Sequence, residues 1–316
     1  PRLLIFANGI NAFCCSAADI VVTTSAQQAF SLIALALITP QRRLVAVEDP
    51  GYGPLRSILA GAGAQLVPIP VDDEGMRIDE IPPDVRMVCV TPSHQSPTGV
   101  ALSLKRRAAL LDFARARDAV VVEDDYDGEF RYGARPLDAL QTLDRDARVF
   151  YVGTFTKSLF PELRKGFVVA PAWARRALVE VKNKTDSNCD ALNQAVLAAF
   201  IRAGHLARYL RRMRKVYAER HAVLVEGLQQ QLHPWLEPIP AEAGLHVAAR
   251  IRRKRDVTAI FEAAHVHTRG VVSMSSYASG PGTPPGLVFG FGLMDAGEIG
   301  PALLKLRRAL EKAAPA

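Results

Sequence analysis

One lysine stands among small hydroxyl residues directly after an apolar run. Lys157 lies within residues 153–164, which follow the apolar residues 149–152, and Arg164 comes seven residues later. Because desolvation disfavours an ammonium group, a lysine after a buried strand is costly unless its neutral amine is used. Such an amine can attack an aldehyde, and the neighbouring hydroxyls together with Arg164 can hold a phosphate. The segment therefore predicts a carbonyl-binding lysine beside a phosphate site, with a solvated loop lysine as the alternative.

A run of acids follows a second apolar segment. Residues 119–122 predict a buried strand, and residues 123–129 read Glu-Asp-Asp-Tyr-Asp-Gly-Glu. Carboxylates at the carboxyl end of a parallel strand lie where open α/β sheets bind ligands. A buried aspartate there can keep a pyridinium nitrogen protonated, and a tyrosine can donate to a phenolate oxygen. Two alternatives are a solvated acidic loop and a metal site made by Asp124, Asp125 and Asp127, although the spacing does not fit an EF-hand.

Three further strand ends carry polar or aromatic residues. Residues 88–99 run from a strand into Thr-Pro-Ser-His-Gln-Ser-Pro-Thr-Gly, and residues 48–52 read Glu-Asp-Pro-Gly-Tyr. Residues 20–28 run from a strand into an apolar helix whose small first residues leave backbone N–H groups free to bind an anion. Together the five strand ends supply an anion site, an aromatic ring for stacking, a hydroxyl, an acid and an amine. Their combination is a stronger indication of a binding site than any one of them.

The elements that must position these residues alternate between strand and helix. Strand patterns lie near residues 19–23, 43–48, 64–69, 86–91, 118–123, 148–153 and 166–170, and the clearest helical patterns cover 26–38, 52–62, 104–117, 171–183 and 189–203. This alternation predicts an α/β fold with a mostly parallel seven-stranded sheet covered by helices on both faces. Residues 166–170 follow the lysine loop without a full helix between, so we expect that strand to be antiparallel.

The chain is predicted to form two domains. Residues 1–212 form the large α/β domain, and residues 213–316 form a smaller α+β domain that is entered by a long interdomain helix. The basic run 208–220 has apolar residues at helical spacing, so it predicts an amphipathic helix with a solvated basic face rather than a DNA-binding surface. The small domain is expected to contain strands near 244–250 and 286–292.

Taken together, the motifs resemble those of a fold-type I, pyridoxal-phosphate-dependent (PLP) aminotransferase of class I/II. The chain is most similar to the aminotransferase-like domain of MocR-type transcription regulators of the GntR family. The matching segments are Thr-Ser-Ala-Gln-Gln (24–28), Glu-Asp-Pro-Gly-Tyr (48–52), Thr-Pro-Ser-His-Gln (91–95) with Pro-Thr-Gly (97–99), Glu-Asp-Asp-Tyr-Asp-Gly-Glu-Phe (123–130) and the lysine segment. This resemblance implies a PLP-binding regulator domain. The alternative is a catalytically active aminotransferase of amino acids or amines.

The resemblance also implies a role for each matching residue. Lys157 forms an internal aldimine with PLP. An amino compound, either effector or substrate, then displaces Lys157 and forms an external aldimine. Lys157 later transfers the proton between the substrate carbon and the cofactor. Asp124, placed by the family's Asp-x-Tyr spacing in preference to Asp125, pairs with the pyridine nitrogen and makes the ring an electron sink. Tyr126 contacts the phenolate oxygen, and Tyr52 stacks on the ring. The remaining cofactor contacts are Ala26, Gln27, Thr154, Thr156 and Arg164 around the phosphate, and Ser96 at a polar cofactor atom.

Three positions depart from the family pattern. Ser25 replaces a glycine near the phosphate, and Ser96 replaces the asparagine of ordinary aminotransferases or the aromatic residue of MocR domains. Val288 stands where amino-acid aminotransferases carry an arginine that binds the substrate carboxylate through two hydrogen bonds. The loss of that arginine favours a sensory domain over transamination of ordinary α-amino acids, and it leaves cofactor binding unaffected.

Composition sets limits on these interpretations. The chain has 316 residues, 49% of them hydrophobic, and a formal net charge of +7 that can steer an attached DNA-binding domain toward phosphate. Its four cysteines lack zinc spacing, which predicts a reducing, cytoplasmic environment, and no apolar stretch approaches the roughly 18 residues of a membrane span. His265 and His267 lack companion ligands, so we expect no metal there and place them in a strand or loop.

The resemblance implies partners as well. Family members build their active site at a two-fold interface, so a homodimer is expected. They also carry a segment before the first motif, and MocR regulators carry a winged-helix DNA-binding domain further upstream. Neither precedes the first motif here, since the sequence begins at Pro1. We therefore interpret the chain as an N-terminally truncated protein whose parent binds DNA only through a domain absent from this chain.

Overall fold

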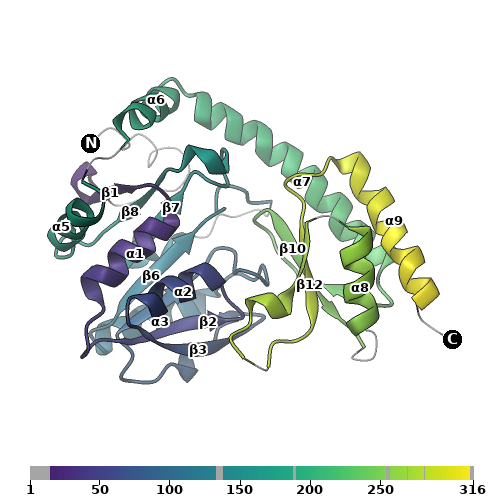
Figure 1. Ribbon diagram of the computed structural model, residues 1–316, viewed down its shortest axis with the longest axis horizontal. Coiled ribbons are helices and arrows are strands. Elements are labelled where there is room, and N and C mark those ends of the chain that lie inside the picture. Colours follow the sequence, from purple (N-terminus) through teal and green to yellow (C-terminus); the bar gives the residue numbers. More distant parts are fainter. Residues whose placement is uncertain are drawn as a thin grey trace.

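A computed structural model describes residues 15–132, 138–187, 190–253, 257–268, 270–280 and 282–313. Pro1 and two of the four cysteines, Cys14 and Cys189, lie outside these ranges. The larger part of the fold is built on an eight-stranded sheet with the order β1-β8-β7-β6-β5-β2-β3-β4 (Figure 1). Its strands are β1 (Ile20–Thr23), β2 (Leu44–Asp49), β3 (Gln65–Asp72), β4 (Gly75–Met76), β5 (Met87–Val90), β6 (Val120–Asp125), β7 (Val149–Thr154) and β8 (Gly166–Val169).

The sheet is mostly parallel, as predicted. Strands β3, β2, β5, β6 and β7 pair in parallel, whereas β8 is antiparallel to both β1 and β7. The predicted antiparallel direction of residues 166–170 is therefore confirmed. The eighth strand, β4, pairs antiparallel with the edge strand β3 and was not predicted, because two residues are too few to show a strand periodicity.

Helices cover both faces of this sheet. They are α1 (Ala26–Leu37), α2 (Gly53–Gly61), α3 (Leu104–Ala116), α4 (Leu140–Leu143) and α5 (Arg175–Thr185), with short 3-10 helices at Ala17–Asp19, Ile78–Glu80 and Pro161–Leu163. In β6, Val120 and Val122 pack in one core with α1, α2 and α5, whereas Val121 packs in a second core with α3. Burial on both faces explains why the central strands are continuous apolar runs.

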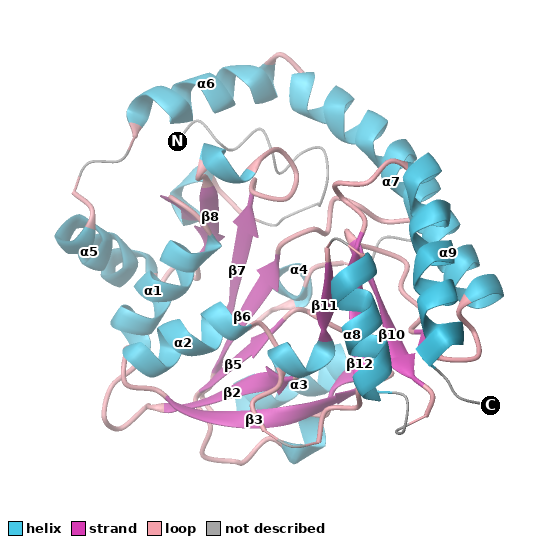
Figure 2. Ribbon diagram, turned by 45° about the vertical axis from the view of Figure 1, so that its right-hand side comes forward, coloured by secondary structure: helices cyan, strands magenta, loops and turns pink. Residues whose placement is uncertain are grey.

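The remaining elements form a smaller sheet with helices beside it. The sheet is antiparallel with the order β11-β12-β10-β9, and its strands are β9 (Leu236–Pro238), β10 (His246–Ile251), β11 (Val271–Ser273) and β12 (Gly286–Gly290). The helices are α6 (Ala191–Arg202), α7 (His205–Gln231), α8 (Val257–His267) and α9 (Ala296–Ala313), with a 3-10 helix at Met274–Tyr277. Figures 1 and 2 show α7 running from α6 to this sheet, where α8 and α9 lie beside it.

Two predictions in this part were confirmed and one was wrong. The strands near 244–250 and 286–292 are β10 and β12. The three-residue strands β9 and β11 were missed because they are too short for a pattern. His265 lies on α8 rather than in a strand or loop, because Ile260, Ala263 and Ala264 are buried at helical spacing.

The long basic helix was predicted correctly. Helix α7 has 27 residues; Leu206 and Leu210 on it are buried, whereas Arg211, Arg212 and Lys215 are exposed. The predicted division between residues 212 and 213 falls inside this helix and stays a prediction. None of the helices in the described ranges combines the length and apolar character required to cross a membrane.

Candidate functional site

One cavity of about 450 Å³ is lined by residues from both sheets and from the segments next to them. All ten residues predicted to contact the cofactor line it: Ala26, Gln27, Tyr52, Ser96, Asp124, Tyr126, Thr154, Thr156, Lys157 and Arg164. They lie at the carboxyl ends of β1, β2, β5, β6 and β7 or in the segments that follow, so the cavity is at the usual ligand position in an open α/β sheet. The structure thus brings together residues spread over about 140 positions of sequence.

Sequence reasoning did not identify most of the lining that comes from the smaller part of the fold. These residues are Leu245, His246, Gly270, Val272, Tyr277 and Gly290, and they lie beside Val288, which had been singled out. No local pattern marks them, because long-range folding alone brings β10, β11 and β12 to the cavity.

Lys157 lies in the turn that follows β7. The strand ends at Thr154, and the lysine comes three residues later, lines the cavity and is exposed. The expected burial of Lys157 at the end of the strand was therefore wrong. The strand itself is buried, but Lys157 comes three residues after its end.

The start of α1 forms an anion site on the cavity wall. Ser25 caps the helix, with its Oγ accepting from the Gln28 backbone N–H at 3.4 Å. The N–H groups of the first helical turn, which include those of Ala26 and Gln27, have no partners within the helix, and the helix dipole favours negative charge there. The Arg164 guanidinium donates to Ser25 Oγ at 3.5 Å, so a cation lies at the same point. This combination suits a phosphate.

Hydroxyl groups complete that wall. Thr154 Oγ1 donates to Thr156 Oγ1 at 2.9 Å, and the backbone N–H of Thr156 donates back to Thr154 Oγ1 at 3.2 Å. Both threonines line the cavity, so their hydroxyls are held in place for a bound anion.

Asp124 is the acid that faces the cavity. Its side chain is buried, and Oδ1 has no hydrogen-bond partner among the described residues. Burial, followed by the nearby carboxylates of Asp125 and Glu48, raises the pKa of Asp124 well above its usual value. Asp125 points to the other face of β6, where its Oδ2 accepts from Tyr151 Oη at 2.6 Å. A buried carboxyl without a partner fits a cationic N–H donor such as a pyridinium nitrogen.

The acidic run is not a solvated loop, so that alternative was wrong. The side chains of Glu123, Asp124 and Asp127 are at most 5% exposed. The three aspartates also do not form the alternative carboxylate metal site. Within the described ranges, the one group of possible metal ligands is instead His94, Asp127 and His246, whose ligand atoms lie within 4.8 Å of one another.

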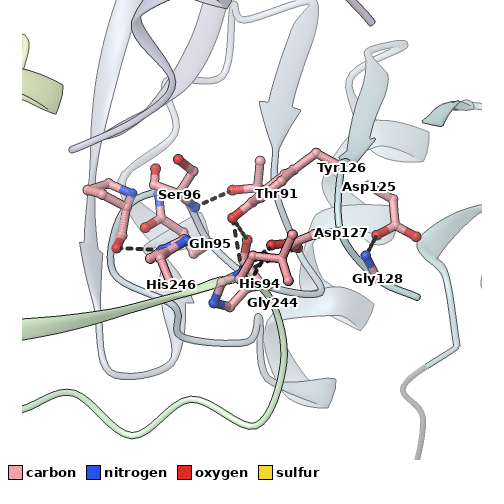
Figure 3. Close-up of polar contacts among 12 residues, drawn as sticks. Thr91, His94, Gln95, Ser96, Asp125, Tyr126, Asp127, Gly128, Gly244 and His246 are labelled. Carbon is pink, nitrogen blue, oxygen red and sulfur yellow. Dashed lines mark hydrogen bonds and ion pairs between the residues drawn. The ribbon is translucent and has the colours of Figure 1, made fainter. Parts of the chain in front are cut away.

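These three residues form a buried polar network around Tyr126 (Figure 3). Tyr126 Oη donates to the His94 carbonyl oxygen at 3.0 Å and lies 3.0 Å from His94 Nδ1. The same ring nitrogen is 3.1 Å from Asp127 Oδ2, which also accepts from the Leu245 backbone N–H at 3.2 Å. The His94 ring packs against His246 with centroids 4.4 Å apart. The network therefore fixes Tyr126 and joins the cavity's two sides.

The backbone at Gly244 closes tightly on this network. A Cβ at Gly244 would lie 1.9 Å from His94 Cε1, and its φ of +86° is in the left-handed region. Gly244→Ala is therefore expected to destabilise the fold by about 3 kcal/mol or more, because it combines overpacking with a strained backbone. Urea denaturation measures the change.

Gly204→Ala is the matched control. Gly204 also has a positive φ, of +72°, but no atom within 4 Å of an added Cβ. It should lose only the backbone cost of about 1 kcal/mol. Equal losses for the two variants would show that His94 does not constrain Gly244.

A buried acid outside the cavity predicts a pH effect. Glu129 is buried, its Oε2 has no hydrogen-bond partner in the part of the chain described, and burial raises its pKa to about 8 from an ordinary 4.5. The folded state then holds the proton more tightly than the unfolded state, so stability is lost as pH rises from 4.5 through 8. Glu129→Gln should remove this loss, with a gain at pH 9 of about 5 kcal/mol at most.

Denaturation at pH 4 and pH 9 checks the effect. The variant and parent should differ little at pH 4, and exposed Glu162→Gln should change neither value. A variant that is less stable than the parent at pH 9 would contradict the assignment.

The fold and the cavity define a class of protein: the fold-type I, PLP-dependent transferase-like proteins. The sequence profile of Aminotransferase class I and II matches residues 6–286, and the chain belongs to this family. Membership implies pyridoxal 5'-phosphate as the cofactor, and the buried Asp124 and the anion site at α1 are the groups that such a cofactor requires.

Similar proteins include regulators and enzymes. The chain is 39% identical over 251 residues to the probable rhizopine catabolism regulatory protein MocR of Rhizobium meliloti, covering 79% of this chain and 51% of that protein. It is 34% identical to the pyridoxine biosynthesis transcriptional regulator PdxR of Corynebacterium glutamicum, with coverages of 88% and 60%. A solved kynurenine aminotransferase of Pyrococcus horikoshii has a TM-score of 0.89 and 27% identity, covering 99% of this chain and 80% of that one.

These similarities define the kind of domain. The chain is an aminotransferase-like domain of the type found in MocR and PdxR regulators, and it spans between half and three fifths of their length.

Proposed function

We propose that this chain is the sensory domain of a MocR-type regulator, which binds PLP at Lys157 and then an amino compound. The convergence of Lys157, Asp124, Tyr126 and the α1 anion site on one cavity carries this proposal. PLP supplies an aldehyde and an electron-withdrawing ring. The Lys157 amine would hold the aldehyde, and the cavity around it would admit the primary amine.

The roles proposed for the other residues follow from their positions. Asp124 accepts from the ring nitrogen and keeps it protonated, because its Oδ1 has no hydrogen-bond partner among the described residues. Tyr126, held by His94, contacts the phenolate oxygen. Tyr52 covers one face of the ring. The N–H groups of Ala26 and Gln27, with Thr154, Thr156 and Arg164, hold the phosphate, and Ser96 contacts a polar atom from the adjacent wall.

A visible absorption spectrum with added PLP tests the proposal. We expect an absorption band typical of a lysine-bound cofactor, and borohydride reduction followed by peptide mapping should find the pyridoxyl group on Lys157. No band, or a label on another lysine, would overturn the assignment.

The second candidate is a catalytically active aminotransferase. The exposed position of Lys157 favours it, since a lysine outside the packed core can transfer the proton as well as bind the cofactor. A turnover assay with an amino donor and a 2-oxo acid separates the two functions. A sensory domain exchanges Lys157 for the amine without forming a new amino acid, whereas an aminotransferase forms one repeatedly.

The partners follow from the same family. We propose a homodimer in a cytoplasmic setting, with DNA bound through a separate winged-helix domain of the parent protein. Sedimentation equilibrium of the chain with and without PLP tests the dimer.

A further inference from the structure

The small sheet presents an uncharged face to the cavity. Its register pairs Val288 of β12 with Val272 of β11 on one side and with Ala248 of β10 on the other. Because side chains alternate along a strand, the next row on this face contains Gly290 and its partner His246. Val272, Val288, Gly290 and His246 all line the cavity. We refer to these four residues as the cavity face.

No cation lies on the cavity face. None of its four residues is a lysine or an arginine. Among the described lining residues, the lysine and arginine side chains are those of Lys157, the proposed cofactor attachment point, and Arg164, which contacts Ser25 at the start of α1. A carboxylate placed over the cavity face would therefore find no lysine or arginine partner on that face, as far as the described residues go.

The cavity face also has room for an uncharged substituent. The nearest atom to a Cβ added at Gly290 is the Gly270 carbonyl oxygen, at 3.4 Å, which is an ordinary contact distance. Leu245 and Tyr277 line the cavity beside it. Apolar side chains and uncovered glycine backbone thus surround the space where the body of an amino compound would lie.

From this arrangement we infer that the amino compound is a primary amine with no acid group, whose uncharged substituent lies against the cavity face. The inference rests on the proposed function, because the amine must exchange with Lys157 at the cofactor. It deepens that function by excluding α-amino acids as the preferred ligands.

Matched pairs that differ only in the carboxylate test this inference. We would titrate the PLP-loaded chain with tyramine and L-tyrosine, and with 3-methylbutylamine and L-leucine, following the visible absorption change. Each amine should bind about tenfold or more tightly than its amino acid, since an unpaired buried charge costs at least that much. Equal binding, or tighter binding of the amino acids, would overturn the inference.

Substitutions on the cavity face locate the effect. Val288→Arg should lower or reverse the preference by about tenfold, because a guanidinium would then pair with the carboxylate. Val288→Ile keeps the face apolar and should leave the preference unchanged. If Val288→Arg does not fold, Val272→Arg serves instead, since Val272 is 44% exposed. An unchanged preference in a folded arginine variant would contradict the assigned position.

The readouts separate this inference from the function on which it rests. Borohydride trapping on Lys157 before any amine is added reports the proposed function alone. If trapping succeeds and the amines show no preference, only the inference fails. If trapping fails, both fail.

Discussion

Lys157→Ala is expected to abolish covalent attachment of PLP while leaving the fold intact. The reason is chemical, because an alanine methyl group cannot attack an aldehyde, and no other lysine lines the cavity among the described residues. Lys157 is exposed in a turn, so its removal should change the free energy of unfolding by no more than about 0.5 kcal/mol. Borohydride reduction and mass measurement should find the pyridoxyl group on the parent chain and none on the variant.

Two further variants control for charge and for lysine content. Lys157→Arg keeps the positive charge but should also fail to trap PLP, which separates bond formation from electrostatic attraction. Lys105→Ala removes an exposed lysine on α3 and should trap PLP like the parent. Undiminished labelling of Lys157→Ala at any single site would remove Lys157 from the proposed role.

The larger sheet could be predicted from sequence because burial on both faces forces a simple pattern. Strands β5, β6 and β7 are buried throughout, so each appears as a continuous apolar run that stops where polar residues begin. The strands that were missed, β4, β9 and β11, have only two or three residues. Their positions depend on pairing with distant strands, which leaves no periodic trace in so short a segment.

The residues of the candidate site likewise divide into those that local sequence reveals and those that depend on long-range contacts. The ten residues of the larger part were found because each lies at the end of a strand or in the loop after it, within a motif that local sequence shows. His94 was part of such a motif, but its contacts with Asp127 and Tyr126 depend on how three strand ends meet. The sequence could not predict that the residues of the cavity face lie side by side, because the register of the small sheet sets the pairing of Val288 with Val272.

Asp124→Asn is expected to weaken PLP binding by about 100-fold, because it replaces the anionic partner of the ring nitrogen with a neutral amide in a buried position. Titration followed by visible absorption measures the dissociation constant. The exposed Asp84→Asn serves as the control and should bind PLP like the parent. Unchanged affinity in Asp124→Asn would mean that the ring nitrogen lies elsewhere.

The same substitution should stabilise the chain when PLP is absent, and the gain should grow with pH. Burial raises the pKa of Asp124 above its ordinary 3.8, so the folded state binds its proton more tightly than the unfolded state. Stability attributable to this group is therefore complete below pH 3.8 and is lost as pH rises toward the folded-state pKa. Asparagine does not ionise and avoids that loss.

Urea denaturation without PLP should show Asp124→Asn more stable than the parent at pH 8 and nearly equal to it at pH 4, whereas saturating PLP should favour the parent at pH 8. The stability difference between variant and parent should therefore change sign when PLP is added, as expected for a carboxylate that binds a cation of the ligand. If Asp124 served only the fold, its replacement would destabilise the chain both with and without PLP.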